Sequence, residues 1–133
     1  MSYKSRSYRY QKLKRGDDFY YLGIPALQEK TYHLYWQRDH KRREKAGLHS
    51  RALFNKNTDS DILKNRNSYK YSEARYIPLA IKTPAWIMGY KDVTVIGLQS
   101  TEGIALEIIN QEIADSFRAY FEAFWKMSKA IIQ

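Results

Sequence analysis

The sequence predicts an α/β fold, with an α+β arrangement as the alternative, in which helices pack on a mixed β-sheet. Six short apolar or alternating runs are each bounded by turn residues, which is typical of strands. Two longer stretches without glycine or proline have helical periodicity, one early and one at the end of the chain. The predicted order is β-α-β-(α)-β-β-β-β-α. A right-handed crossover through the first helix makes its flanking strands parallel, and the later strands can join by hairpins.

The first third of the chain predicts a strand, a long helix and a second strand. Residues 18–22 form an aromatic run that ends at a glycine, which indicates a strand. Pro25 suits the first turn of a helix, and residues 26–46 continue without glycine or proline to Gly47, a favourable C-terminal stop. Residues 48–54 alternate in polarity and predict the next strand.

The middle of the chain is polar and weakly patterned. A short helix is predicted over residues 60–66, with Asp59 or Ser60 as its N-cap. Residues 73–79 predict a strand that is stopped by Pro78.

The last part of the chain predicts three strands and a helix. Residues 85–88 and 93–98 form a hairpin around residues 89–92, and residues 104–109 follow after a turn. Asn110 is a good N-cap for the final helix. An aromatic helix of this kind should lie on the sheet and supply much of the core. The positions that follow the helical period are Ile113, Phe117, Tyr120, Phe121, Phe124, Met127 and Ser128.

Composition bounds the class of protein. The 133 residues are enough for one domain with a real core, and 44% apolar with 28% charged residues is ordinary for a globular protein. No run of about eighteen apolar residues predicts a membrane span, and no secretory signal is found. The chain has no cysteine, which excludes thiol catalysis and thiolate metal sites and fits a cytoplasmic protein. The three histidines lack metal-binding spacing with carboxylates, so we expect no metal and no cofactor.

The positive charge lies in the first part of the chain. Residues 1–75 hold 18 Lys and Arg against 8 Asp and Glu, whereas residues 76–133 hold 5 against 6. Residues 1–16 carry six basic and no acidic side chains, which predicts a flexible arm or a linker before a domain at 17–133. Such asymmetry favours an anionic partner such as nucleic acid, although a basic protein surface often serves solubility alone. The predicted nucleic-acid contacts are Lys4, Arg6, Arg9, Lys12, Lys14, Arg15, Lys41, Arg42 and Arg43.

Several segments together resemble one known family. They are GIPALQEKTYHLYWQRDHKRREKAGLHSRALFN, EARYIPLAIKTPAWIMGYKDVTVIG and GIALEIINQEIADSFRAYFEAFWK. They are similar to the effector domain of TrmB-type archaeal transcription regulators, a domain of the phospholipase D-like superfamily, over roughly residues 17–129. The marks are a strand-Gly-x-Pro-helix start, Arg42 and Arg43 before Gly47, the turn at 89–92, and the run from Ile113 to Phe117 with Phe121 and Trp125.

The chain lacks the catalytic motif of that superfamily. Its enzymes use His-x-Lys-x4-Asp, in which histidine is the nucleophile and lysine holds phosphate. In this chain the hairpin aspartate is Asp92, and counting back seven residues puts Ala85 at the histidine and Ile87 at the lysine. An alkyl side chain can neither attack phosphorus nor bind its oxygens. We therefore expect no catalytic residue and read Asp92 as a turn residue. TrmB-type domains commonly lack the motif too.

The resemblance does not extend to the DNA-binding winged helix that precedes the effector domain in TrmB-type regulators. Residues 1–16 are too short for a winged helix, so the chain is a fragment, acts alone, or contacts DNA through its basic arm. The resemblance further implies a homodimer, because phospholipase D-like halves often pair across a two-fold axis.

Three functions follow from these observations. The first is a non-catalytic domain that senses a small-molecule effector, dimerises, and acts through a DNA-binding module. The second is direct nucleic-acid binding by the basic first half of the chain, and the third is a phosphodiesterase with a degenerate site. The ligand-binding residues predicted for the first are Trp36, Arg43, Arg75, Tyr76, Trp86 and Lys91.

Overall fold

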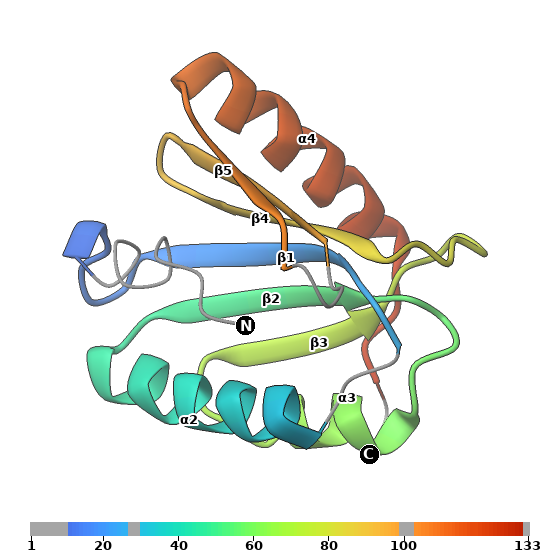
Figure 1. Cartoon of the computed structure of the whole chain (residues 1–133). Coiled ribbons are helices and arrows are strands. Elements are labelled where there is room, and N and C mark those ends of the chain that lie inside the picture. The colour runs from blue at the N-terminus through green and yellow to red at the C-terminus, as the bar shows by residue number, and fades with distance from the viewer. Residues whose placement is uncertain (1–10, 27–29, 99–102, 132–133) are drawn as a thin grey trace.

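Six strands and three helices make up the described part of the chain (Figure 1). The computed structural model describes residues 11–26, 30–98 and 103–131. The elements are β1 (Asp18–Ile24), α2 (Lys30–Ala46), β2 (His49–Phe54), α3 (Ser60–Asn67), β3 (Ser72–Tyr76), β4 (Ala85–Tyr90), β5 (Val93–Leu98), β6 (Ala105–Ile109) and α4 (Gln111–Met127).

The strands form one mixed sheet in the order β3-β2-β1-β4-β5-β6. β1 pairs with β2 and β2 with β3 in parallel, while β4, β5 and β6 continue antiparallel from β1. The predicted mixed sheet with packed helices is therefore confirmed, as are the parallel crossover and the hairpins. β3 and β4 follow each other in sequence but are not neighbours, because β2 and β1 lie between them.

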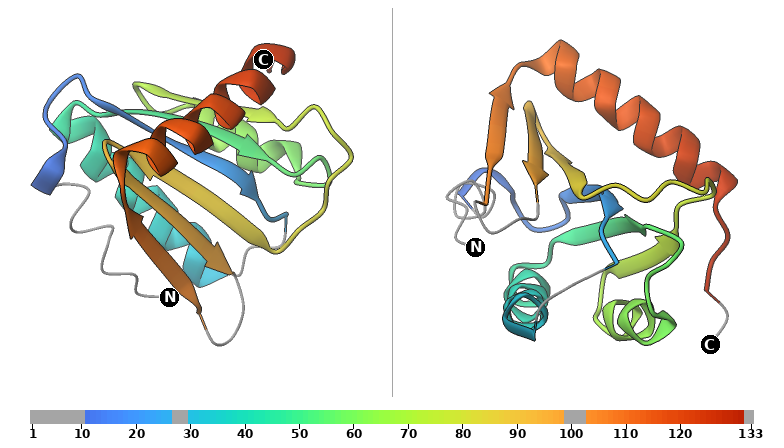
Figure 2. Two further views of the ribbon diagram at one scale, coloured as in Figure 1. Left: turned by 90° about the horizontal axis from the view of Figure 1, so that it is seen from above. Right: turned by 45° about the vertical axis from the view of Figure 1, so that its right-hand side comes forward.

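The helices lie on both faces of the sheet. α2 and α3 cover one face beneath β1, β2 and β3, and α4 runs diagonally across the other face (Figures 1 and 2). The short αβ connections keep α2 and α3 on the same side, since both crossovers join parallel neighbours.

Most predicted elements are present, with shifted ends. β1 continues past its expected end at residue 22 to Ile24, and β3 stops at Tyr76 rather than at 79. The predicted start of α2 falls at residues 26–29, of which 27–29 lie outside the described residues. Both predicted N-caps are confirmed: Asp59 accepts from the N–H of Asp61, and Asn110 accepts from the N–H of Ile113.

Gly47 ends α2 as predicted. Its φ of +71° is in the left-handed region, and the N–H of Leu48 donates to the carbonyl of Arg43 at 3.1 Å. This is the hydrogen bond of a Schellman motif, which satisfies one of the last carbonyls of a helix.

β1 is buried on both faces and divides the apolar interior into two cores. Phe19 and Tyr21 face α2 and α3, in a core that also contains Met88 and Val95. On the other face Tyr20 belongs to a smaller core beneath α4. A side-chain period of two along the strand makes this division unavoidable.

The close packing of β4 on β5 depends on a glycine. A Cβ at Gly97 would lie 2.3 Å from the ring of Trp86, its neighbour across the β4–β5 pair. Only a glycine leaves room for the indole, which is 5% exposed.

α4 supplies less of the core than its aromatic pattern predicts. Phe121 is fully buried and stacks on Tyr20 with ring centroids 4.5 Å apart. Ile113, Tyr120 and Met127 were expected in the core but are 37%, 59% and 58% exposed. The side of α4 that bears Phe121 packs on the sheet, whereas the side that bears Ile113, Tyr120 and Met127 remains in solvent.

The prediction of a flexible arm over residues 1–16 is wrong for residues 11–16, the part that the structure describes. Leu13 is buried in the larger core, and the N–H of Gly16 donates to the carbonyl of Gly47 at 2.8 Å. Residues 11–16 are therefore part of the domain, because a single leucine in a polar run docks beside β1 and the end of α2. Residues 1–10 lie outside the described part.

Replacement of Phe121 tests the attachment of α4. Phe121→Ala should lower the free energy of unfolding by about 3–5 kcal/mol, because it removes a fully buried ring and leaves a cavity. The matched control is Tyr120→Ala on the same helix, where a largely exposed ring is lost and the change should stay within about 0.5 kcal/mol. Urea denaturation at low protein concentration measures both. Equal losses in the two variants would contradict this packing.

Candidate functional site

The positions that correspond to the catalytic motif lie at the two ends of β4. Ala85 begins the strand and Ile87 is its third residue, whereas Asp92 lies in the turn beyond its last residue. At about 3.3 Å per residue, residues 85 and 92 are roughly 20 Å apart along the strand. The carboxylate of Asp92 lies 3.3 Å from Lys12 Nζ, and its carbonyl accepts from the N–H of Asn110. The reading of Asp92 as a turn residue is confirmed.

The two histidine side chains that the structure describes each pack against a tyrosine ring, away from that turn. His40 on α2 stacks on Tyr69 with centroids 5.0 Å apart, and its Nδ1 accepts from Arg43 Nε at 3.2 Å. His49 opens β2 and packs on Tyr71 at 4.7 Å. The side chain of His33 lies outside the described residues.

Three of the six predicted ligand-binding residues lie on the α2 face of the sheet. Trp36 and Trp86 both pack on Tyr21, at 5.1 and 6.1 Å between centroids. Tyr76 donates its hydroxyl to the carbonyl of Thr58 at 2.9 Å, and burial is the main cause that raises its pKa. These three aromatic side chains pack in or against the core, and their contacts are explained by packing without a ligand.

The other three predicted residues lie on different elements: Arg43 on α2, Arg75 on β3 and Lys91 in the β4–β5 turn. Arg43 is fully buried and donates from Nη1 to the carbonyl of Leu48 at 2.7 Å, so its prediction as a ligand or nucleic-acid contact is wrong. Arg75 is on the α4 face, with its guanidinium 4.1 Å from the ring of Trp125. Lys91 is in the β4–β5 turn and pairs with Asp17 at 2.9 Å. The six residues do not form one site.

The predicted nucleic-acid residues divide into three groups. Lys4, Arg6 and Arg9 lie outside the described residues. The second group adjoins the end of α2: Arg15 lies over Gly47 and donates to the carbonyl of Lys45 at 3.1 Å. Arg15 shares this second group with Lys12 and Lys14, and all three are exposed. The third group is on α2 itself, where Lys41 and Arg42 are exposed and Arg43 is buried.

A polar depression lies at the amino ends of β1, β2 and β3, and we call it the amino-edge hollow. Its volume is about 510 Å³. A second depression of about 350 Å³ adjoins it at Asp18, beside the β4–β5 turn. The first is lined by Gly16, Asp18, His49, Ser50, Arg51, Tyr71, Ser72 and Glu73. The second is lined by Asp17, Asp18, Lys91, Gln111, Asp115 and Arg118, none of which is histidine.

Tyr71 is the unusual residue of the amino-edge hollow. Its φ is +60°, a region that bulky side chains rarely adopt, and its side chain is 48% exposed. The carbonyl of Tyr71 accepts from the N–H of Ser50 at 2.8 Å, which ties this backbone to β2. Backbone strain of about 1–3 kcal/mol is retained mainly where the surrounding structure imposes it, often at binding sites.

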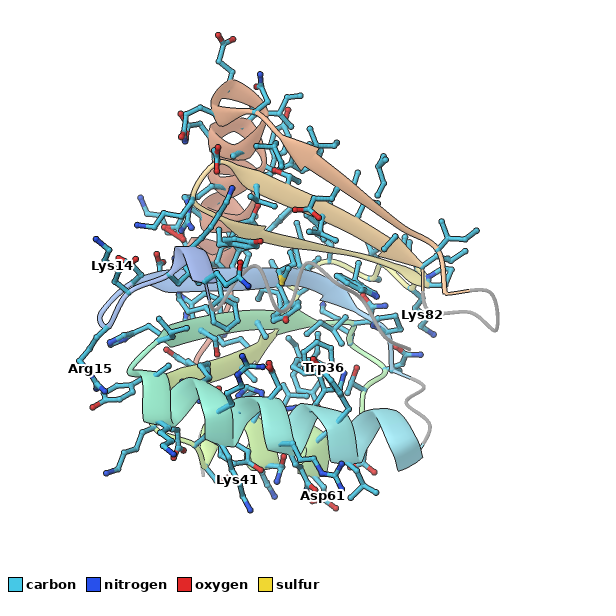
Figure 3. All side chains as sticks on the ribbon, turned by 60° about the vertical axis from the view of Figure 1, so that its left-hand side comes forward. Lys14, Arg15, Trp36, Lys41, Asp61 and Lys82 are labelled. Atoms are coloured by element: carbon cyan, nitrogen blue, oxygen red, sulfur yellow. The ribbon has the colours of Figure 1, made fainter. Side chains whose placement is uncertain are left out.

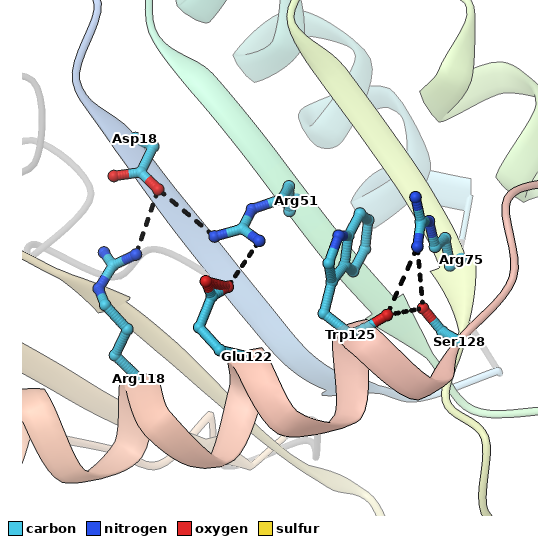
Figure 4. A network of polar contacts seen from close by, with 7 residues as sticks. All are labelled: Asp18, Arg51, Arg75, Arg118, Glu122, Trp125 and Ser128. Carbon is cyan, nitrogen blue, oxygen red and sulfur yellow. Dashed lines mark hydrogen bonds and ion pairs between the residues drawn. The ribbon is translucent and has the colours of Figure 1, made fainter.

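A network of charged side chains joins α4 to the sheet beside the hollow (Figure 4). Asp18 is shared by Arg118 at 3.1 Å and Arg51 at 3.6 Å, and Arg51 also pairs with Glu122 at 2.6 Å. Arg118 lies 5.3 Å over the ring of Tyr20, whose pKa burial raises to about 12. Arg51 and Arg118 each form an ion pair and also pack over an aromatic ring. These contacts hold Asp18 and Arg51 in place where they line the hollow.

Sequence reasoning missed this network. Arg118 and Glu122 are four residues apart on α4, and Arg51 occupies an outward position of an alternating strand. These are weak signals, because the same spacing is common on any solvated helix. Only the diagonal path of α4 brings these side chains to Asp18, a hundred residues away in sequence from Arg118.

No protein-family model matches the chain, and no curated protein sequence matches it either. The likeness to TrmB-type effector domains therefore stays a prediction. Among the described residues, no helix is long and apolar enough to cross a membrane. Within the same residues, no three His, Asp or Glu side chains gather as metal ligands would.

The pKa of Asp17 tests the electrostatics of the second depression, beside the β4–β5 turn. The N–H of Lys14, followed by the ammonium of Lys91, lowers this pKa from its ordinary value of 3.8. Lys91→Met should raise the pKa toward 3.8 but leave it lower, because the Lys14 N–H still donates at 2.9 Å. A carboxyl NMR titration measures it, with Lys82→Met as the control that leaves it unchanged.

The sign of the stability effect follows from that direction. A lowered pKa means that the interaction stabilises the fold above the ordinary pKa, and that this contribution is lost as pH falls through the folded value. An Asp17 pKa that does not move in Lys91→Met would show that the ion pair contributes nothing.

Proposed function

We propose that this chain is a non-catalytic recognition domain that binds a small-molecule effector and dimerises, as the effector domain of a TrmB-type transcription regulator would. The observation that carries the proposal is the concentration of exposed apolar side chains in the segment of β6 and α4. Recognition domains that transmit a signal need a surface through which a ligand-dependent state reaches another module. A concentration of exposed apolar side chains is suited to that task.

The apolar face is concentrated in one segment of the chain. Ten large apolar side chains are exposed among the described residues, and six of them lie between residues 104 and 127. Ile109 is on the opposite side of β6 from Leu106, and we call the other five the β6–α4 face: Ile104, Leu106, Ile113, Tyr120 and Met127. β6 is also an edge strand, whose outer side has no strand partner in the described part of the chain. Natural edges are usually protected by charge or by a covering partner.

The spacing along α4 favours a second copy of the chain as the partner. Ile113, Tyr120 and Met127 are seven residues apart, so they lie on one side of the helix. Tyr120 is at the centre of this row. A two-fold axis near Tyr120 would place Ile113 of one copy against Met127 of the other, which makes the row self-complementary.

The amino-edge hollow is the proposed place for the effector. It presents an exposed ring at Tyr71 together with the charged groups of Asp18, Arg51 and Glu73. A ring that can stack beside fixed donors and acceptors suits a polar ring-shaped ligand such as a sugar or a nucleotide. The network from Asp18 through Arg51 to Glu122 links this hollow to α4, and so to the proposed dimer face.

The residue types at the motif positions support a role without catalysis. Ala85 and Ile87 offer no nucleophile and no cation, and Lys91 in the adjacent hollow is paired with Asp17. Turnover of a generic phosphodiester that survived replacement of all three histidines would contradict the superfamily chemistry and this reading together.

Sedimentation equilibrium tests the dimer. The wild-type chain should sediment as a dimer at micromolar concentration, and Tyr120→Glu should sediment as a monomer, because a buried unpaired carboxylate is costly at an interface. Lys126→Glu is the matched control: it adds an acidic group to the same helix away from the apolar row and should leave the dimer intact.

A single cysteine tests the position of the two-fold axis. The chain has no native cysteine, so Tyr120→Cys should give a disulfide-linked dimer on oxidation, and Lys126→Cys should not. A wild-type chain that stays monomeric at high concentration would overturn the proposed dimer. A thermal-shift screen with sugars and nucleotides, with and without Tyr71→Ala, is the corresponding measurement for the effector.

The basic surface around the end of α2 favours a second candidate function, nucleic-acid binding. Arg15 and Lys41 lie on the α2 side of the molecule, and Lys14 lies beside the start of β1 (Figure 3). All three are exposed, and Arg15 is held to the end of α2 through the carbonyl of Lys45. Such a cluster can neutralise phosphates on one strand of a nucleic acid.

Salt dependence tests this second candidate. Affinity for a nucleic acid should fall steeply with salt, and Lys41→Glu should weaken it and reduce the slope of log K against log salt by about one. Lys82→Glu makes the same charge change away from the α2 end and should change affinity less. Filter binding at several salt concentrations measures both. No binding at low salt removes this candidate.

A further inference from the structure

A small cavity lies between α2, α3 and the sheet, away from the amino-edge hollow and the β6–α4 face. Its volume is about 20 Å³, enough for one occupant the size of a water molecule or a halide ion. Its lining combines aromatic and polar side chains from both helices and three strands. The lining residues are Tyr21, Ile24, Trp36, His40, Ser50, Ala52, Phe54, Arg66 and Ser72.

Arg66 is the charged group of this cavity and it is only partly satisfied. The residue is 3% exposed, and its Nη1 donates to Asn65 Oδ1 at 2.5 Å. Its Nη2 is buried and makes no hydrogen bond within the described residues. Burial lowers the pKa of Arg66 to about 10, which still leaves the guanidinium charged at neutral pH. A buried charge without a counter-ion is costly, and proteins rarely keep one.

No carboxylate of the described residues forms an ion pair with Arg66. None of the residues that line the cavity is acidic. The cavity therefore offers the guanidinium of Arg66 no negatively charged side chain, and a bound ion is the remaining source of a counter-charge there.

The polar groups around the cavity suit an anion better than a water molecule. His40 Nδ1 already accepts from Arg43 Nε at 3.2 Å, so this ring nitrogen is not left to bind Arg66. Ser50 and Ser72 contribute hydroxyl groups that are only 3.5 Å apart and weakly bonded to each other. Both hydroxyl groups can turn to donate beside the guanidinium, and in a low-dielectric interior the attraction of a guanidinium for an anion is strong.

We propose that the cavity is a binding site for a single small monatomic anion of the chloride class, held by Arg66 Nη2 with help from the hydroxyl groups of Ser50 and Ser72. The anion neutralises the buried guanidinium where α2 and α3 pack on the sheet. Chloride is then part of the folded domain, independently of any effector, partner or nucleic acid.

Thermal unfolding in matched salts tests the site. The melting temperature of the wild-type chain should be higher in sodium chloride than in sodium gluconate at equal ionic strength, by about 3–6 °C when chloride is tenfold above its Kd. Arg66→Met, which keeps the length of the side chain and removes its charge, should abolish the difference. Lys64→Met is the matched control: it removes an exposed charge from the same helix and should keep the full difference.

A crystal grown in bromide gives a second readout that does not depend on the variants folding. One anomalous peak should lie within hydrogen-bonding distance of Arg66 Nη2. Equal melting temperatures in the two salts, a chloride effect that persists in Arg66→Met, or a cavity that holds only water in bromide would each overturn the proposal.

Discussion

The burial of β1 on both of its faces is the constraint on which the rest of the structure depends. Its alternate side chains, Phe19 and Tyr21 on one face and Tyr20 on the other, are the centre of two separate cores. It also changes the direction of the sheet, since it pairs in parallel with β2 and antiparallel with β4. Neither helical layer could be removed without exposing an aromatic face of this strand, so α4 and the pair of α2 and α3 are held at opposite sides of one ribbon.

The two helical layers use charge in different ways. Beneath the sheet, Arg43 serves the end of α2 and Arg66 remains inside without a compensating carboxylate, which creates the need for an anion. Above the sheet, Asp18 and Glu122 form ion pairs with Arg118 and Arg51 between α4 and the sheet. These side chains are partly exposed, so solvent screening leaves each pair only a small contribution to stability. The lower layer therefore depends on its electrostatics for stability, whereas the upper network mainly orients α4.

The orientation of α4 connects the proposed functions. Because Phe121 stacks on Tyr20 and Arg118 reaches Asp18, the helix presents the side that bears Tyr120 to solvent. A ligand in the amino-edge hollow would contact the same charged groups that position the helix. Binding there could then change how α4 presents its apolar side to a second copy, through differential contacts in the two states.

The element order, the parallel crossover, both N-caps and the turn at Asp92 could be predicted from the sequence, because they depend on local periodicity and on single capping or turn residues. Which side of α4 is buried follows only from the tertiary structure, because Tyr120 and Phe121 are adjacent aromatic residues that differ in what lies opposite them. Tertiary structure also decided that Arg43 is buried although its neighbours in a basic run are exposed. Local pattern records the residue type, but burial depends on contacts with residues distant in sequence, and no periodicity encodes those.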